Sequence, residues 1–383
     1  MTKLSVEKLF LDFGSHEILK NVSVGLERGE VVVLLGPSGS GKTTLLRAIA
    51  GLELPKRGTI RIDDQVMFDG ASNLEVPAEQ RNLGFVFQSY GLWPHRTVFD
   101  KVAYGLRLRK LPAAEVERRT RKALDELGLG VLSRRYPHQL SGGQQQRVAI
   151  ARSLVYEPPV ILMDEPLSNL DAKLREEAKS WLRSLIVELQ LSAVVVTHDQ
   201  SEAMAMADRI VLLSAGRVEQ EGTPEEIYNQ PRTLFAAEFF GLNNRLTGRV
   251  EQIDGSSALL AGPGWRARGN AREALRPGEP GVGVIRVERG RLASAAGDNR
   301  FEVTAVTSMF MGDHWQHILR LGETLVQVKG DCRITGSAHW LEVAPEDLWI
   351  FKDPTGGGVS ASQAPALEGP GLPRASAAAV AQP

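Results

Sequence analysis

The residues from Gly36 to Thr43 have the types and spacing needed to bind phosphate. They read Gly36-Pro37-Ser38-Gly39-Ser40-Gly41-Lys42-Thr43. Glycines let a backbone wrap so that its N–H groups point inward at phosphate oxygens, and a following helix N-terminus adds its positive dipole end. Lys42 can reach the β and γ phosphates, and the Thr43 hydroxyl can bind Mg²⁺. The pattern predicts a nucleotide site.

The elements around this loop are those that a phosphate-binding loop requires. The apolar run from Glu30 to Leu35 ends at a glycine and predicts a strand buried on both faces. Residues 44–50 predict a helix that stops at Gly51. A strand before the loop and a helix after it favour phosphate binding over a simple glycine-rich turn.

A second apolar run, Val160 to Met163, ends in two adjacent acids, Asp164 and Glu165. A parallel sheet binds its ligands at the carboxyl ends of its strands, and Mg²⁺ prefers hard oxygen ligands, so Asp164 is a candidate metal ligand. Glu165 is suited to act as a general base on a water molecule. Together with the phosphate loop, the pair predicts hydrolysis of a nucleoside triphosphate.

Between these two motifs lies the run Leu140-Ser141-Gly142-Gly143-Gln144, which resembles the signature motif of ABC-type ATPases. Its physical basis is again a helix N-terminus that offers a hydroxyl and backbone N–H groups to an anion. The resemblance implies that Ser141 and Gly143 contact the ATP of a second subunit. The expected assembly is therefore a homodimer in which two chains enclose two nucleotides.

Other motifs of that family follow in the family's order. Gln88 follows the strand-like residues 83–87 and resembles the Q-loop glutamine that touches Mg²⁺ and the attacking water. Residues 168–171 resemble the D-loop, with Asn169 where alanine is more usual and Asp171 at its end. His198 follows the strand-like residues 193–197 and resembles the switch histidine that bonds the γ-phosphate. Phe13 stands where the family stacks an aromatic ring on adenine.

The resemblance covers residues 3 to about 240 and implies ATP and Mg²⁺ as the bound groups. The expected catalytic residues are Glu165, His198 and Gln88, and the expected Mg²⁺ ligands are Thr43, Gln88 and Asp164. The expected nucleotide contacts are Phe13, Gly36, Pro37, Ser38, Gly39, Ser40, Gly41, Lys42, Thr43, Thr44, Ser141, Gly142, Gly143, Gln144 and Asp171.

The chain divides into three segments that differ in composition and in hydrophobic pattern. Residues 1–240 alternate buried strand patterns with helical ones, such as residues 112–127 and 174–189, and predict an α/β nucleotide-binding domain of the ABC type. In the second helix, Leu174 and Leu182 are expected to share one apolar face. Residues 241–352 carry short strand patterns that predict a small β-barrel or sandwich. The family resemblance implies that this segment is an all-β regulatory domain folded like a small oligonucleotide-binding barrel. Residues 353–383 are rich in Pro, Gly and Ala and predict a disordered tail.

Composition excludes several classes. The chain has 383 residues, with 45 Lys+Arg against 46 Asp+Glu and a net charge of −1, which disfavours a basic nucleic-acid binder. The single cysteine, Cys332, excludes a disulfide framework and a cysteine-based zinc site. No apolar run long enough to span a membrane and no secretory signal occurs, so a cytosolic protein is expected.

Among ABC proteins, the sequence is most similar to the stand-alone ATP-binding subunits of binding-protein-dependent importers for ferric iron, polyamines, maltose and sulfate. Residues 88–99 resemble the segment that docks a membrane subunit, with Tyr90 and Trp93 as exposed docking aromatics. The resemblance implies two membrane-spanning permease subunits, an extracytoplasmic solute-binding protein and a peripheral place on the cytoplasmic face of the inner membrane. Ferric iron is the first expected solute and polyamine the second, with sulfate or sugar as further alternatives. A nucleic-acid-dependent ABC ATPase is the rival from another class, and the neutral charge weighs against it.

Overall fold

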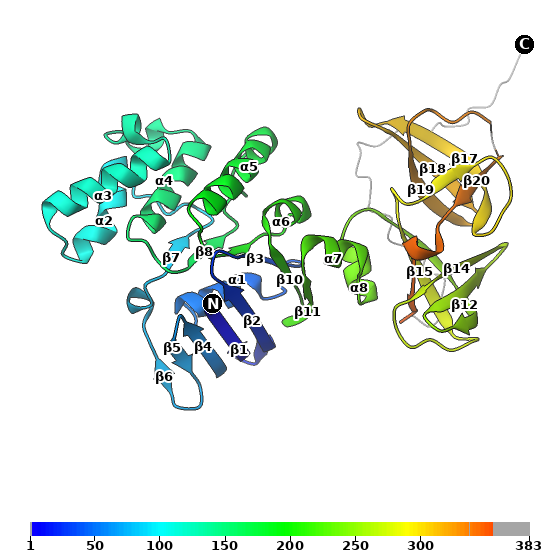
Figure 1. The fold of residues 1–383 in the computed structure, drawn as a ribbon, viewed down its shortest axis with the longest axis horizontal. Coiled ribbons are helices and arrows are strands. Elements are labelled where there is room, and N and C mark those ends of the chain that lie inside the picture. Colours follow the sequence, from blue (N-terminus) through cyan, green and yellow to red (C-terminus); the bar gives the residue numbers. More distant parts are fainter. Residues whose placement is uncertain (1, 337, 355–383) are drawn as a thin grey trace, which may run out of the picture.

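The computed structural model describes residues 2–336 and 338–354. Figure 1 shows an α/β part that contains the N-terminus and a β-rich part beyond it, joined through the helices α7 (Pro224–Asn229) and α8 (Leu234–Phe239). The β-rich part begins at β12 (Asn243–Asp254), close to the predicted division after residue 240. The predicted tail, 353–383, lies outside the described residues except for its first two positions.

A six-stranded sheet forms the centre of the α/β part, with the order β11-β10-β3-β9-β8-β7. All but β11 run parallel, and β11 pairs with β10 antiparallel. The strands predicted at residues 30–35, 160–163 and 193–196 are present within a residue of their expected ends. The strands are β3 (Val31–Leu35), β7 (Gly84–Val86), β8 (Ile161–Asp164), β9 (Ala193–Val196), β10 (Arg209–Ser214) and β11 (Arg217–Gly222).

A second, antiparallel sheet has the order β2-β1-β4-β5-β6. Its strands are β1 (Thr2–Phe13), β2 (His16–Glu27), β4 (Arg57–Ile62), β5 (Gln65–Asp69) and β6 (Leu74–Glu75). The helix α1 (Lys42–Ala50) packs between this sheet and the parallel one. Successive residues of a strand point to opposite faces, so Val33 joins the core under the helices and Leu34 joins the core around α1.

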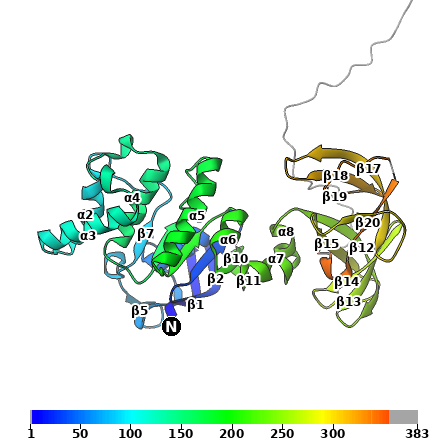
Figure 2. The ribbon, with the colours of Figure 1, turned by 45° about the horizontal axis from the view of Figure 1, so that its top comes forward.

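The remaining helices of the α/β part cover the other face of the parallel sheet or form a lobe beside it (Figures 1 and 2). They are α2 (Val98–Leu108), α3 (Ala113–Glu126), α4 (Gly142–Leu154), α5 (Ala172–Glu188) and α6 (Gln200–Met206). The helices predicted at 112–127 and 174–189 correspond to α3 and α5. Leu182 is buried as predicted, but the prediction for Leu174 is wrong: it is 39% exposed, because residues 171–174 at the start of α5 all lie at the surface.

The β-rich part contains a closed barrel with the order β12-β13-β14-β21-β15 and a five-stranded sheet with the order β16-β20-β17-β18-β19. One apolar cluster runs through both and includes Leu246, Leu260 and Phe301. The predicted β-rich class is therefore confirmed, with a sheet added to the barrel. The further strands are β13 (Ser257–Gly262), β14 (Trp265–Ala271), β15 (Pro280–Arg286), β16 (Arg291–Ala293), β17 (Arg300–Phe310), β18 (Trp315–Leu321), β19 (Thr324–Gly330), β20 (Ala338–Glu342) and β21 (Leu348–Lys352).

Among the described residues, no helix has both the length and the apolar character needed to cross a membrane.

A buried arginine fixes the far end of α1. Arg81 is 1% exposed, and its Nη1 donates to the carbonyls of Ala48 (2.9 Å) and Ile49 (2.8 Å) at the C-terminal end of the helix. A cation at a helix C-terminus is favoured by the helix dipole, and Arg81 adds a donor to the Ala48 carbonyl, which also accepts from the Gly51 N–H at 3.1 Å. The helix that follows the phosphate loop is therefore held at both ends.

Replacing Arg81 by alanine removes this cap and the donors that it offers to the carbonyls of Ala48 and Ile49. We expect Arg81→Ala to lower the free energy of unfolding by about 3 kcal/mol, measured by urea denaturation of the full chain. The exposed Arg217 on β11 provides the control, and Arg217→Ala should change the stability by less than about 0.5 kcal/mol. Equal effects of the two substitutions would contradict the capping role.

Candidate functional site

The loop between β3 and α1 has the backbone conformation that its glycines permit. Gly39 and Gly41 have φ values of 80° and 99°, in the left-handed region that favours glycine. A Cβ at Gly36 would lie 2.1 Å from the Leu213 carbonyl oxygen, so only glycine fits there. The loop wraps closely over the carboxyl end of β3, as predicted.

Two polar groups inside the loop are suited to an anion. The Lys42 side chain is buried, and its Nζ donates to the carbonyls of Gly36 (2.8 Å) and Pro37 (2.9 Å). Burial lowers the pKa of Lys42, and the nearby Glu165 and Asp164 partly oppose that shift. The Ser40 hydroxyl is buried with no hydrogen-bond partner. A buried cation and an unpartnered hydroxyl on a glycine-rich loop fit a polyphosphate group.

Thr43 and Asp164 form the oxygen pair expected for a divalent cation. The Thr43 Oγ1 donates to the Asp164 Oδ1 at 3.1 Å, although the two residues are far apart in sequence. Asp164 is 5% exposed, and burial raises its pKa against the opposing hydrogen bond from Thr43. A hydroxyl and a carboxylate held together beside the phosphate loop fit Mg²⁺, which takes oxygen ligands.

Three loops that follow parallel strands meet at Glu165. Gln88, after β7, donates its Nε2 to the Glu165 Oε2 at 2.8 Å. The Nδ1 of His198, after β9, lies 3.0 Å from the Glu165 Oε1. Glu165 itself has a φ of 45°, a left-handed conformation in which a non-glycine residue is strained. The structure therefore brings the three predicted catalytic residues together, one from each of three adjacent strands.

The signature run belongs to a different part of the fold. Ser141 caps the N-terminus of α4, and its hydroxyl accepts from the Gln144 N–H at 3.3 Å, while the Gln144 side chain accepts from the Ser141 N–H at 3.0 Å. The helix α4 packs against α2, α3 and β7, whereas α1 packs against β2, β8 and β9. Ser141 is exposed, and the first-turn residues Gly142 and Gly143 are half-buried. Within one chain the signature group is thus held apart from the phosphate loop's helix.

The other residues predicted to contact the nucleotide lie on the phosphate loop, at the start of α1 and α5, and at the end of β1. Phe13 is 48% exposed at the end of β1, and the following strand β2 packs its Leu19 against Gly41 of the loop. Asp171 caps α5 by accepting from the Leu174 N–H at 3.0 Å. Thr44 lies in the first turn of α1. Pro37 and Ser38 are exposed on the loop.

Sequence patterns did not indicate how the Gln88 loop is held. The Asn169 side chain donates to the Gln88 carbonyl at 2.5 Å, and Arg152 donates to the carbonyls of Tyr90 (2.9 Å) and Gly91 (2.5 Å). The predicted exposure of Tyr90 is wrong: it is 6% exposed and packs in the helical core, with a φ of 61° that turns its backbone inward. Trp93 is 38% exposed, as predicted, and makes an edge contact with Tyr104.

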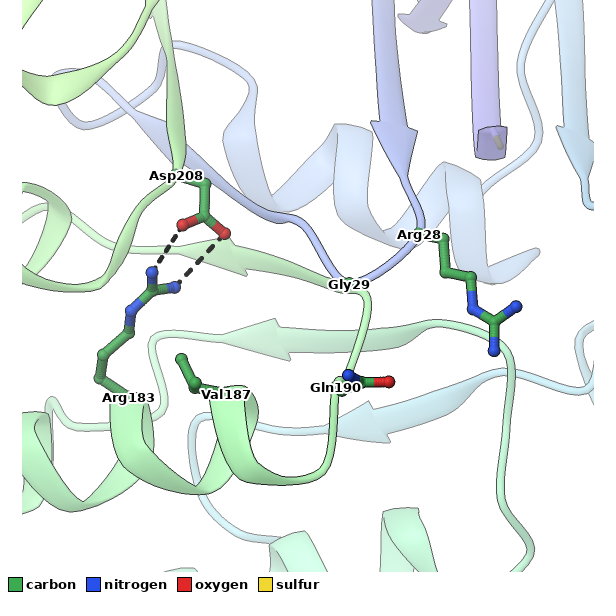
Figure 3. Close-up of a pocket in the computed structure, with 6 residues that line it drawn as sticks. All are labelled: Arg28, Gly29, Arg183, Val187, Gln190 and Asp208. Atoms are coloured by element: carbon green, nitrogen blue, oxygen red, sulfur yellow. Dashed lines mark hydrogen bonds and ion pairs between the residues drawn. The ribbon is translucent and has the colours of Figure 1, made fainter.

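A separate hollow of about 340 Å³ lies at the opposite edge of the sheet (Figure 3). Gly29 precedes β3 and Asp208 precedes β10, so the hollow adjoins the amino ends of these parallel strands. Arg183 and Asp208 form an ion pair at 2.6 Å, and the Val31 N–H donates to Asp208 at 2.8 Å. Arg183 and Asp208 neutralise one another here, and ligands of parallel sheets bind at the other edge, so we assign no ligand to the hollow.

The raised pKa of Asp164 predicts how the stability of the ligand-free chain changes with pH. In the folded chain its ionised form is disfavoured by burial, so above its raised pKa the charge destabilises the ligand-free protein, and this cost disappears as the pH falls. Asp164→Asn keeps an acceptor for Thr43 and removes the charge. We expect this variant to unfold at a higher temperature than the parent chain at pH 8, measured without ligand by calorimetry.

The difference in unfolding temperature should shrink towards zero as the pH falls to the ordinary carboxyl pKa of about 4. Glu177→Gln, at an exposed position on α5, is the control and should leave the unfolding temperature unchanged. A lower unfolding temperature for Asp164→Asn at pH 8 would contradict the account.

Residues 19–168 match the ABC transporter family. The chain is 48% identical over 243 residues to the spermidine/putrescine import ATP-binding protein PotA of Vibrio cholerae, a match that covers 63% of each chain. It is 45% identical over 291 residues to PotA of Salmonella typhimurium, which covers 76% of this chain and 75% of the relative.

The chain is also similar to a sulfate importer subunit and to a solved structure. The sulfate/thiosulfate import ATP-binding protein CysA of Thermosynechococcus vestitus is 47% identical over 256 residues, covering 67% of this chain and 74% of the relative. The solved structure of cbiO1 from Clostridium perfringens, part of the ABC transporter complex cbiONQ, superposes with a TM-score of 0.53 at 32% identity, covering 59% of this chain and 90% of cbiO1. The chain therefore belongs to the ABC transporter family, as an ATP-hydrolysing, ATP-binding subunit of the import type.

Proposed function

We propose that this chain is the motor subunit of an importer and that it couples ATP hydrolysis to movement of a solute through membrane-spanning partners. The observation that carries the proposal is the meeting of Gln88, Glu165 and His198 beside the phosphate loop. We also propose that residues 1–240 form the nucleotide-binding domain and residues 241–352 the regulatory domain.

Each side chain at the site has a role in this proposal. Lys42 and the backbone N–H groups of the loop bind the phosphates, and Phe13 stacks on the adenine. Thr43, Asp164 and Gln88 are the candidate ligands of Mg²⁺, which when bound neutralises the phosphate charge. Glu165 accepts the proton of the attacking water. Gln88 and His198 orient that water and the γ-phosphate.

In the proposed dimer, each ATP site combines the phosphate loop of one chain with the signature residues of the other. The signature residues Ser141, Gly142, Gly143 and Gln144 form the N-cap and the first turn of α4, with Ser141 exposed and the other three half-buried. In the proposed homodimer these groups bind the ATP held by the partner's phosphate loop, and Asp171 lies at the contact between the two copies. ATP closes the dimer, and hydrolysis allows it to open.

The proposed partners are two permease subunits and an extracytoplasmic solute-binding protein. The loop after Gln88, with exposed Trp93, is the proposed docking site for a permease. This places the chain at the cytoplasmic face of the inner membrane as a peripheral subunit. We propose no nucleic-acid partner, because the net charge of −1 weighs against binding to a phosphate backbone.

The solute is proposed on the names of the relatives. Both PotA proteins are named as spermidine/putrescine importers and CysA as a sulfate/thiosulfate importer. These relatives give no support to the prediction of ferric iron. We therefore propose a polyamine as the solute, with sulfate as the second candidate.

Removing the base should separate ATP binding from ATP turnover. Glu165→Gln keeps a side chain of the same shape that still faces Gln88 and His198. We expect it to bind ATP with unchanged affinity, to lower kcat by at least about 100-fold and to accumulate a stable ATP-bound dimer. Steady-state ATPase assays and light scattering measure the two effects.

The exposed Glu177 again provides the matched control, and Glu177→Gln should retain the activity of the parent chain. Unchanged turnover in Glu165→Gln would refute the assignment of the base.

The solute is tested by uptake in cells that lack this chain. We expect labelled spermidine uptake to be lost and to return with the parent chain but not with Glu165→Gln. Labelled sulfate and labelled ferric iron are measured in the same strains. Restoration of sulfate or iron uptake alone would reject the polyamine proposal and leave the motor function in place.

A further inference from the structure

A side chain next to His198 reaches out of the catalytic domain to the junction with the β-rich part. Gln200 is the first residue of α6, two positions after His198. Its Nε2 donates to the carbonyl of Phe239, and its Oε1 accepts from the N–H of Gly241 at 3.0 Å. Both ends of one amide thus bind the backbone where α8 ends and before β12 begins.

The segment that carries His198 and Gln200 is internally fixed. The Asp199 N–H donates to the Thr197 Oγ1 at 3.0 Å, and the Thr197 Oγ1 donates to the buried Glu202 at 2.7 Å. Asp199 also caps α6 by accepting from the Glu202 N–H at 3.0 Å. These hydrogen bonds hold the residues on both sides of His198, so we expect a displacement of Gln200 to move His198 as well.

The junction is fixed on its other side by the barrel. Asn243 donates to the Phe240 carbonyl at 2.9 Å and accepts from Arg286 at 2.6 Å. Arg286, on β15, is 1% exposed and also donates to the carbonyls of Ala237 (2.8 Å) and Phe240. Its Nη2 donates to the Tyr228 carbonyl on α7 at 3.2 Å, so this buried guanidinium attaches the ends of both α7 and α8 to the barrel.

We propose that Gln200 is a positioning residue that ties His198 to the junction, so that the placement of the β-rich part sets the position of His198 relative to Glu165. The inference rests on the proposed function, because it requires His198 to act in ATP hydrolysis. Any event that shifts the β-rich part against α8 then alters turnover through hydrogen bonds on the Gln200 amide, without a contact to the nucleotide.

The chain contains a matched control. Gln220, on β11, binds backbone in the same way at the other end of α8, between α7 and α8: its Nε2 donates to the Gln230 carbonyl at 3.1 Å, and its Oε1 accepts from the Arg232 N–H at 2.8 Å. Gln220 is not next to a catalytic residue. If the amide hydrogen bonds at the two ends of α8 serve only to stabilise the fold, substitutions of Gln200 and Gln220 should have equivalent effects.

The experiment compares Gln200→Met with Gln220→Met in the full chain, because methionine keeps the length of glutamine and removes both hydrogen bonds. We expect Gln200→Met to lower the kcat for ATP about tenfold, with the KM for ATP within about twofold of the parent value. Gln220→Met should leave both constants within about twofold. Thermal unfolding of each variant measures how far stability is affected.

A second variant removes the hydrogen bonds that Asn243 makes at the junction and leaves α6 unchanged. Asn243→Leu should lower kcat as Gln200→Met does, and the double variant should lose no more than the larger single loss, since both act on one connection. This variant decides the question if Gln200→Met does not fold.

An unchanged kcat in Gln200→Met, equal losses in the two glutamine variants, or additive losses in the double variant would overturn the inference. A parent chain that hydrolyses no ATP would instead refute the proposed function.

Discussion

The hydrogen bonds of the Glu165 carboxylate connect the loops on which the rest of the site depends. Gln88 and His198 come from strands on either side of β8, and each faces one oxygen of Glu165. The order β3-β9-β8-β7 makes this meeting possible, because neighbouring parallel strands end at the same edge of the sheet. The phosphate loop after β3 joins that edge, with Lys42 and Thr43 facing the acids. A displacement of any one of these loops therefore changes the surroundings of the Glu165 carboxylate.

A second constraint is charge. A polyphosphate needs more donors and cations than one loop provides, and burying an unpaired charge is costly. The ligand-free chain already holds Lys42 and Asp164 with pKa values shifted towards their neutral forms by burial. An entering anion and its metal ion relieve both shifts. The signature hydroxyl of Ser141 lies on a different packing unit of the same chain, and in the proposed dimer the partner's copy supplies it.

Much of this could be predicted from sequence, for identifiable reasons. The buried strands were visible as β-branched runs, and the phosphate loop was visible because only glycines allow its turn. The side-chain hydrogen bonds that hold these loops and helices could not be predicted. Arg81, Asn169 and Gln200 each donate to a backbone carbonyl that is far away in the sequence. Exposed and buried aromatics were confused at Tyr90, where a left-handed backbone turns an apparently surface residue inward. The solute left no pattern, because the proposed transport path belongs to other subunits.

The central claim is that each ATP site is completed by a second copy of the chain. Its direct test uses single-cysteine chains in which the exposed Cys332 is replaced by serine. One chain carries Ser38→Cys in the phosphate loop and the other carries Ser141→Cys at the start of α4. A short bismaleimide should join the two kinds of chain when they are mixed with ATP and Mg²⁺, and should not do so without ATP. Cross-linking that ignores ATP, or that forms within a single chain carrying both cysteines, would contradict the claim.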